Sequence, residues 1–207
     1  MNSKLTIKDA LDIFKKTNFD KINSPEINKG SRGQSIEKIL GLTNNSKLID
    51  LEDGELKTFT RGESIPITQI HHCLSEIIYE SISYENSKVG QKLNQVLFLG
   101  FSRDNQFLGY NIINKNIDLN IYMKILEDYE FICNKIREVY NKKEQLNTIN
   151  GPNSILQIRT KASKNNKTNK YPPLMFNGHK LKDKYMAFYL HPSFGKKYVL
   201  LTDFHNF

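Results

Sequence analysis

Apolar and polar positions follow two different periods along this chain. Apolar side chains recur at helical spacing over residues 6–16 and, over the longest stretch, from residue 118 to about residue 142. A shorter helix is expected from about Gln34 to Leu40, with Gly30 and Gly33 flanking a tight entry to it. The pattern therefore predicts three amphipathic helices.

Other segments have the pattern of strands. A nearly continuous apolar run from Gln95 to Phe101 predicts a central strand that is covered on both faces. Residues 68–81 are expected to form a helix or a long buried segment, and a closing helix is expected from Pro192 to about Leu201. Further strands are expected at residues 107–113, 154–160 and 184–190. This order predicts an α/β or α+β domain with a mixed central β-sheet flanked by helices.

The segment from residue 47 to residue 60 carries the first candidate chemistry. Two paired strands are expected around an Asp53-Gly54 turn, with Asp50 ending the first and Glu55 opening the second. Glu55 and Lys57 leave the same face of their strand, because side chains alternate. Asp53 competes with Asp50 as a ligand, but its turn position favours local hydrogen bonding, so Asp50 is preferred.

Glu37 is a third candidate acid, beside the apolar stripe of the short helix. Carboxylates that hold a hard cation, with an ammonium group nearby, are what a Mg²⁺-dependent phosphodiesterase needs. A Glu-x-Lys on the exposed face of a strand is more often simply solvated. The rest of the chain has to decide between these two interpretations.

Charge favours a polyanionic partner. The chain of 207 residues carries 30 Lys and Arg against 22 Asp and Glu, a formal net charge of +8. The excess gathers between residues 159 and 184. This region includes a basic, asparagine-rich loop with Lys164, Lys167 and Lys170.

The rest of the sequence argues against a membrane-spanning protein, a secreted protein and a metal site built from His and Cys. No apolar run is long enough to span a membrane, and residues 1–9 lack the apolar core of a signal peptide. Cys73 and Cys133 are expected to be buried thiols in a reducing cytoplasm. A metal cage of His and Cys is not supported, because His71, His72 and Cys73 are adjacent and point apart.

Four sequence segments occur in one order along the chain. They are Lys29-Gly30-x-x-Gly33-Gln34-x-x-Glu37 with the following Asp50 and Glu55-Leu56-Lys57-Thr58; Lys92-Leu93-x-x-Val96-Leu97-Phe98; Leu156-Gln157-Ile158-Arg159-Thr160-Lys161-Ala162; and Phe188-Tyr189-Leu190-x-x-Ser193-Phe194. Together they resemble the MutH/Sau-type, GATC-cleaving branch of the PD-(D/E)xK endonuclease superfamily. The resemblance covers about residues 29–201.

The resemblance implies a role for each candidate of the catalytic site. Asp50 and Glu55 would bind Mg²⁺ (or Mn²⁺ as a substitute) together with the scissile phosphate, and Glu37 would complete the acidic cluster. Lys57 would position the attacking water, and Lys92 would be an accessory basic group.

The resemblance also implies a DNA-recognition surface. Arg159, Lys161 and Tyr189 fall on positions that the family uses around its GATC target, with Tyr189 near the adenine that methylation marks. Arginine or lysine on a guanine edge is the commonest specific contact, although generic phosphate binding is the alternative for Arg159 and Lys161. Lysines of the basic loop would bind backbone phosphates: Lys164, Lys167 and Lys170.

The implied fold is restriction-endonuclease-like, a single endonuclease domain with two lobes around a DNA cleft. The catalytic lobe would span about residues 1–115 and the recognition lobe about residues 116–207. The chain departs from the family pattern in a shorter interval between Asp50 and Glu55, which leaves the choice between Asp50 and Asp53 as the ligand open. It also departs in Thr160, which stands where the family often has proline.

Three functions remain open at this point. The first is a type II restriction enzyme that cuts double-stranded DNA at GATC, with a second copy of the chain pairing on the near-palindromic target. The second is a mismatch-repair nickase that cuts the unmethylated strand. The third is a DNA-binding module whose acidic cluster is merely structural. The Asn-, Lys- and Ile-rich composition favours the first.

Overall fold

The computed structural model describes residues 5–19, 29–42, 48–116, 119–161, 164, 168 and 170–199. The helical segments are α1 (Ile7–Phe14), α2 (Lys29–Ile39), η2 (Ile70–His72), α3 (Leu74–Ile78), η3 (Tyr84–Asn86), α4 (Lys88–Leu93), α5 (Leu119–Asn141), α6 (Pro192–Phe194) and η4 (Gly195–Val199). The strands are β1 (Glu55–Thr60), β2 (Ile65–Gln69), β3 (Gln95–Phe101), β4 (Phe107–Asn114), β5 (Ile149–Asn150), β6 (Leu156–Thr160), β7 (Leu174–Phe176), β8 (His179–Lys182) and β9 (Met186–Leu190).

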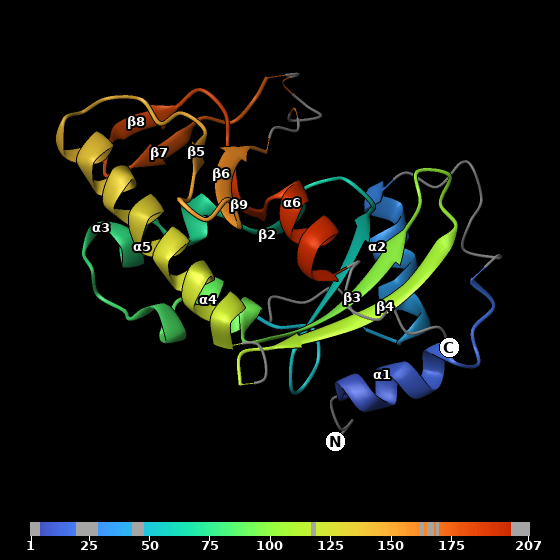
Figure 1. Ribbon diagram of the computed structural model, residues 1–207. Coiled ribbons are helices and arrows are strands. Elements are labelled where there is room, and N and C mark those ends of the chain that lie inside the picture. Colours follow the sequence, from blue (N-terminus) through green and yellow to red (C-terminus); the bar gives the residue numbers. More distant parts are fainter. Residues whose placement is uncertain are drawn as a thin grey trace.

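The strands of the described residues form three sheets in a mixed α+β arrangement (Figure 1). In the first sheet, β3 lies between β1, to which it is parallel, and β4, to which it is antiparallel. The second sheet is antiparallel in the order β2-β9-β6-β5, and β7 and β8 form a hairpin. The predicted mixed sheet is thus confirmed, although the strands divide among several sheets.

Strand β3 explains why its sequence is apolar throughout. Val96 and Phe98 belong to one hydrophobic cluster, whereas Leu97, Leu99 and Phe101 belong to another. Since successive side chains of a strand point to opposite faces, β3 separates the two cores. The predicted bounds of this central strand are confirmed.

Helices α1 and α2 cover one face of the first sheet (Figure 1). Helix α1 begins as expected, because Thr6 and Asp9 form a capping box. Helix α2 begins at Lys29, earlier than predicted, so Gly30 and Gly33 lie inside it rather than at its entry. A glycine inside a helix costs only about 1 kcal/mol, which packing of the buried face can offset.

The hairpin expected over residues 47–60 was wrong. Residues 48–53 form bends, and β1 pairs with β3 instead. Asp53 Oδ1 accepts a hydrogen bond from the backbone N–H of Ile7 at 2.7 Å, which ties this segment to α1. Gly54 packs so closely against β3 that a Cβ atom would lie 2.8 Å from the carbonyl oxygen of Gln95. Long-range contacts therefore override the local turn signal.

Helix α5 packs against the second sheet and runs beside it in Figure 1. Its predicted extent is confirmed within the described residues, and its apolar stripe is buried. The carboxylate of Asp128 lies in this stripe and is fully buried. It accepts backbone hydrogen bonds from Asn153, Ile155 and Leu156 at 2.7–2.8 Å, and so fixes the start of β6.

Other predicted boundaries need correction. Strand β6 begins at Leu156, after a turn in which the Ser154 N–H donates to the carbonyl oxygen of Gly151 at 2.9 Å, and β9 begins at Met186. The segment predicted at 68–81 divides into the end of β2, η2 and α3. The closing helix begins at Pro192 as expected but continues as a π-helical turn, and its predicted end lies outside the described residues.

Two further predictions concern the whole chain. Within the described ranges, no helix has both the length and the apolar composition needed to cross a bilayer. Cys73 and Cys133 are buried free thiols, as expected.

Candidate functional site

The candidate catalytic residues meet at the start of β1, an edge strand of the first sheet. Glu55 and Lys57 leave the same face of β1, as predicted, and the Lys57 ammonium forms an ion pair with Glu55 Oε1. Lys92, in the last turn of α4, places its Nζ 2.7 Å from the same oxygen. The structure thus brings Lys92 to Glu55 and Lys57, 37 positions away from Glu55 in sequence.

Glu55 is a buried acid that is only partly satisfied. Its side chain is 1% exposed, and Oε1 receives both ammonium groups. Its other oxygen, Oε2, is buried and has no hydrogen-bond partner among the residues that the structure describes. A buried oxygen without a partner is costly, so this atom is suited to an additional donor or cation.

Asp50 and Asp53 have different roles in the fold. Asp50 Oδ2 accepts a hydrogen bond from the backbone N–H of Leu56 at 3.1 Å, so its carboxylate lies next to β1. Asp53 is exposed and directed to the first turn of α1, where it binds the Ile7 N–H. Asp50 is therefore the better placed of the two to act with Glu55.

Glu37 reaches the same region from α2. Partial burial raises the pKa of its carboxyl above the usual value, the negative charges of Asp50 and Glu55 raise it further, and Lys57 opposes these effects. The three acids thus influence each other electrostatically. A divalent cation between them would offset this repulsion.

Arg32 holds the helix that carries Glu37, and the sequence pattern did not reveal it. Its guanidinium is buried, donates to Asn105 Oδ1 and Thr60 Oγ1 at 2.9 Å each, and lies 4.4 Å from the centre of the Phe101 ring. These contacts join α2 to the end of β1 and to the β3–β4 turn. Burial lowers the pKa of this arginine.

A cavity of about 200 Å³ opens at the edge of β1. Its charged lining residues are Glu37, Lys57 and Lys161. Lys161 was predicted at the DNA target, and its backbone position directly follows β6. Burial of its ammonium group lowers the pKa of Lys161, and the nearby charge of Lys57 lowers it further. The structure therefore places Lys161 beside the candidate catalytic residues.

Arg159 precedes Lys161 by two residues, so the two side chains leave the same face of the strand. Arg159 is directed to Ser64, which directly precedes β2. Its Nη1 donates to Ser64 Oγ at 3.1 Å, and its guanidinium carbon lies 5.5 Å from the centre of the Tyr189 ring. The buried side chain of Gln157 donates to the same serine oxygen at 2.9 Å. Ser64 and Gln157 were not predicted, because a serine in a polar turn gives no signal of a partner so far away in sequence.

The basic loop is described only in part. Lys164 and Lys184 place their ammonium groups 5.8 Å and 4.3 Å from the centre of the Tyr171 ring. Lys170 is exposed, whereas Lys167 lies outside the described residues. The described lysines are thus available to a polyanion at the surface.

The predicted metal site is not preformed. In the parts of the chain that the structure describes, no group of three or more His, Cys, Asp or Glu side chains is arranged to hold a metal ion. Two observations nevertheless suit a hard cation: the unpartnered Oε2 of Glu55, and the raised pKa of Glu37 beside two other acids. Carboxylate oxygens are the ligands that Mg²⁺ prefers.

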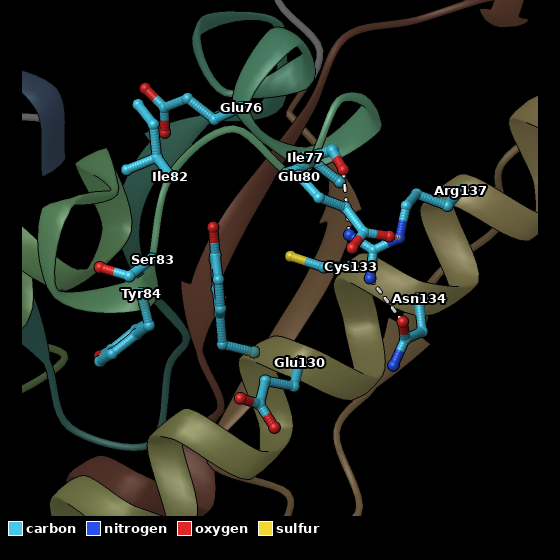
Figure 2. A pocket seen from close by; sticks show the side chains of 11 residues that line it. Glu76, Ile77, Glu80, Ile82, Ser83, Tyr84, Glu130, Cys133, Asn134 and Arg137 are labelled. Carbon is cyan, nitrogen blue, oxygen red and sulfur yellow. Dashed lines mark hydrogen bonds and ion pairs between the residues drawn. The ribbon is translucent and has the colours of Figure 1, made fainter.

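A second cavity, of about 390 Å³, lies between α3 and α5 (Figure 2). Arg137 pairs with Glu80 at 2.9 Å and donates to the carbonyl oxygen of Ile77 at 3.0 Å, whereas the buried hydroxyl of Tyr84 has no hydrogen-bond partner among the described residues. Cys133 also lines it, and burial raises the pKa of this thiol to about 12, so the thiol stays protonated at neutral pH. Cys133 therefore does not provide this cavity with an activated thiol.

Comparison with known proteins does not assign the chain to a family. No family model matches the chain, and no curated protein matches it significantly. The assignment to a nuclease superfamily thus remains a prediction from the four sequence segments.

Proposed function

We propose that the protein is a Mg²⁺-dependent, sequence-specific DNA endonuclease, a type II restriction enzyme that cleaves at GATC. One observation carries the proposal. Glu55 is a buried acid with two lysines on one oxygen and no partner on the other, at the edge of a sheet beside two further acids. This arrangement is costly for a structural residue and useful for phosphodiester hydrolysis.

The proposed chemistry divides among the clustered residues. Glu55, Asp50 and Glu37 would hold Mg²⁺, which when bound provides Lewis-acid activation of the phosphate and of water. Lys57 orients the attacking water, and Lys92 fixes the Glu55 carboxylate through Oε1. Hydrolysis would leave 5′-phosphate and 3′-hydroxyl ends, as in the family that the sequence resembles.

DNA recognition would come from the second sheet. Arg159 is exposed, preoriented by Ser64 and Tyr189, and has the donor geometry that reads guanine in the major groove. Exposed lysines of the basic loop add phosphate contacts that carry no sequence information. This division matches the proposed restriction-endonuclease-like architecture, with a catalytic lobe and a recognition lobe around the DNA.

Double-strand cleavage requires two active sites on one target. Each copy of the chain carries one cluster around Glu55, so a single molecule cuts one strand. We therefore propose that a second copy binds the other half of the near-palindromic site on DNA.

The test is digestion of one plasmid, prepared with and without adenine methylation, by wild-type protein and by Glu55→Gln in Mg²⁺. The wild-type protein should cut both strands at GATC. Glu55→Gln keeps the side chain's shape but removes its charge, so turnover should fall at least about 100-fold while DNA binding is retained. Glu144→Gln, a change at an exposed acid beyond α5, is the matched control and should cut normally.

The same digestion separates the competing functions. Weak nicking confined to the unmethylated plasmid would indicate a repair nickase instead. DNA binding without any product in Mg²⁺ or Mn²⁺ would indicate a binding module and end the endonuclease proposal.

A further inference from the structure

The cavity at the edge of β1 has an uneven distribution of charge. Two of its lining residues are lysines and one is an acid, Glu37. Lys57 is already paired with Glu55. In the described part of the chain, no hydrogen bond or ion pair engages the ammonium group of Lys161. Lys161 is therefore the lining cation whose ammonium group is available to a ligand.

The backbone of Lys161 is held by the second sheet. Its N–H donates to the carbonyl oxygen of Tyr185 at 2.8 Å, which extends the pairing of β6 with β9 by one residue beyond Thr160 and Met186. The side chain therefore starts from a fixed point, and its direction toward Lys57 and Glu37 follows from the sheet rather than from a loose loop.

Lys161 and Arg159 share a strand face but have different surroundings. Arg159 lies on Ser64 and Tyr189, away from the acids. Lys161 lines the cavity that also contains Glu37 and Lys57. A group beside the residues that hydrolyse the backbone is placed to contact the backbone itself, whereas base edges lie in the grooves.

On this basis we infer that Lys161 forms a phosphate-binding site at the catalytic cavity. Lys161 holds a backbone phosphodiester next to the scissile one and does not read a base. The inference rests on the proposed endonuclease function and refines it: sequence reading is left to Arg159 and Tyr189, and Lys161 aligns the strand for cleavage.

The first experiment compares wild type, Lys161→Ala and Lys161→Arg on a GATC duplex and on duplexes with one base pair changed. Loss of a phosphate contact weakens binding to all sequences alike. Lys161→Ala should therefore lower kcat/KM about 10- to 100-fold on every cleavable duplex, with the ratio between sequences unchanged, and Lys161→Arg should restore most of the rate. Lys8→Ala, at an exposed position of α1, is the control. A change of about tenfold or more in the ratio between GATC and its variants would identify a base reader and overturn the inference.

The second experiment needs no cleavage, so its failure is distinguishable from failure of the proposed function. Neutral methylphosphonates replace the phosphates of a GATC duplex one at a time, and affinity is measured without divalent metal. Wild type should lose affinity at one phosphate beside the cleavage position, and Lys161→Ala should lose nothing further there, because the contact is already gone. The plot of log binding constant against log salt concentration has a negative slope, and its magnitude should decrease by about 0.9 in Lys161→Ala. If the losses of affinity caused by Lys161→Ala and by the methylphosphonate add fully at every phosphate, the phosphate site is overturned, even if the wild type proves to be a nuclease.

Discussion

Asp128 and Glu55 are both buried acids, but their surroundings are opposite. Three backbone N–H groups at 2.7–2.8 Å surround the Asp128 carboxylate, and both of its oxygens are used. Glu55 has two ammonium groups on Oε1 and no partner on Oε2. Within the described residues, the fold provides hydrogen-bond donors to both oxygens of Asp128 but to only one oxygen of Glu55.

This difference teaches how a structural acid can be separated from a functional one. A buried carboxylate that accepts all its hydrogen bonds from the backbone stabilises a junction, here between α5 and β6. A buried carboxylate with an unused oxygen lowers stability unless something else binds to it. In this pair, the unused hydrogen-bonding capacity of Oε2 distinguishes Glu55, the proposed site residue, from Asp128.

The largest expected effect tests the structural member of the pair. Asp128→Asn replaces one accepting oxygen by an amide group that cannot accept, so at least one buried N–H loses its partner. We expect the free energy of unfolding to fall by about 2–4 kcal/mol, measured by urea denaturation. Asp12→Asn, at an exposed acid of α1 that pairs with Lys15, should change it by less than about 1 kcal/mol. If the two changes lower the free energy of unfolding equally, the buried hydrogen bonds of Asp128 contribute no more to stability than an exposed ion pair.

The second prediction, with an effect of intermediate size, concerns Glu55, the proposed metal ligand. Mg²⁺ should stabilise the wild-type protein against thermal unfolding, by about 2.7 kcal/mol at a concentration one hundred times its dissociation constant. Glu55→Gln should abolish this stabilisation, whereas Asp128→Asn should retain it on a lower baseline. An unchanged response to Mg²⁺ in Glu55→Gln would remove Glu55 from the metal site.

The smallest effect concerns Glu37, whose pKa is raised chiefly by burial and then by Asp50. The folded state binds this proton more tightly than the unfolded state, so ionisation of Glu37 lowers stability. The cost is absent below the ordinary glutamate pKa, appears as the pH rises through it, and is complete above the raised value. Glu37→Gln should therefore match wild type near pH 4 and be slightly more stable at pH 7 to 8 without Mg²⁺.

Denaturation curves at the two pH values check this prediction. The same variant should lose cleavage activity, because a stabilising change at a catalytic position removes the charge that the reaction needs. A variant less stable than wild type at neutral pH would assign Glu37 a structural role instead.

Some of the fold could be predicted because its signals are local or follow from burial on both faces. The β3 run and the α5 stripe were found from periodicity alone, and the Thr6–Asp9 capping box marked the start of α1. The structure also brings together Glu55, Lys57 and Lys92, three of the residues that the sequence segments suggested for the site.

Other features depend on partners that sequence spacing cannot reveal. Asp53-Gly54 has the chemistry of a hairpin turn, yet Asp53 binds Ile7, 46 positions away in sequence. Arg32 contacts Thr60 and Asn105, at separations of 28 and 73. Asp128 did leave a signal, because a charged residue at an apolar position of α5 indicates a buried partner.

The parallel pairing of β1 with β3 has a consequence for how the site comes into being. Glu55 pairs with Val96 across a segment that contains β2, α3 and α4, and closing so long a segment is slow relative to local folding. A growing or partly unfolded chain holds Glu55 and Lys57 but not Lys92 beside them. If the protein is the proposed endonuclease, its cleavage activity would therefore depend on completed folding of the segment between β1 and β3.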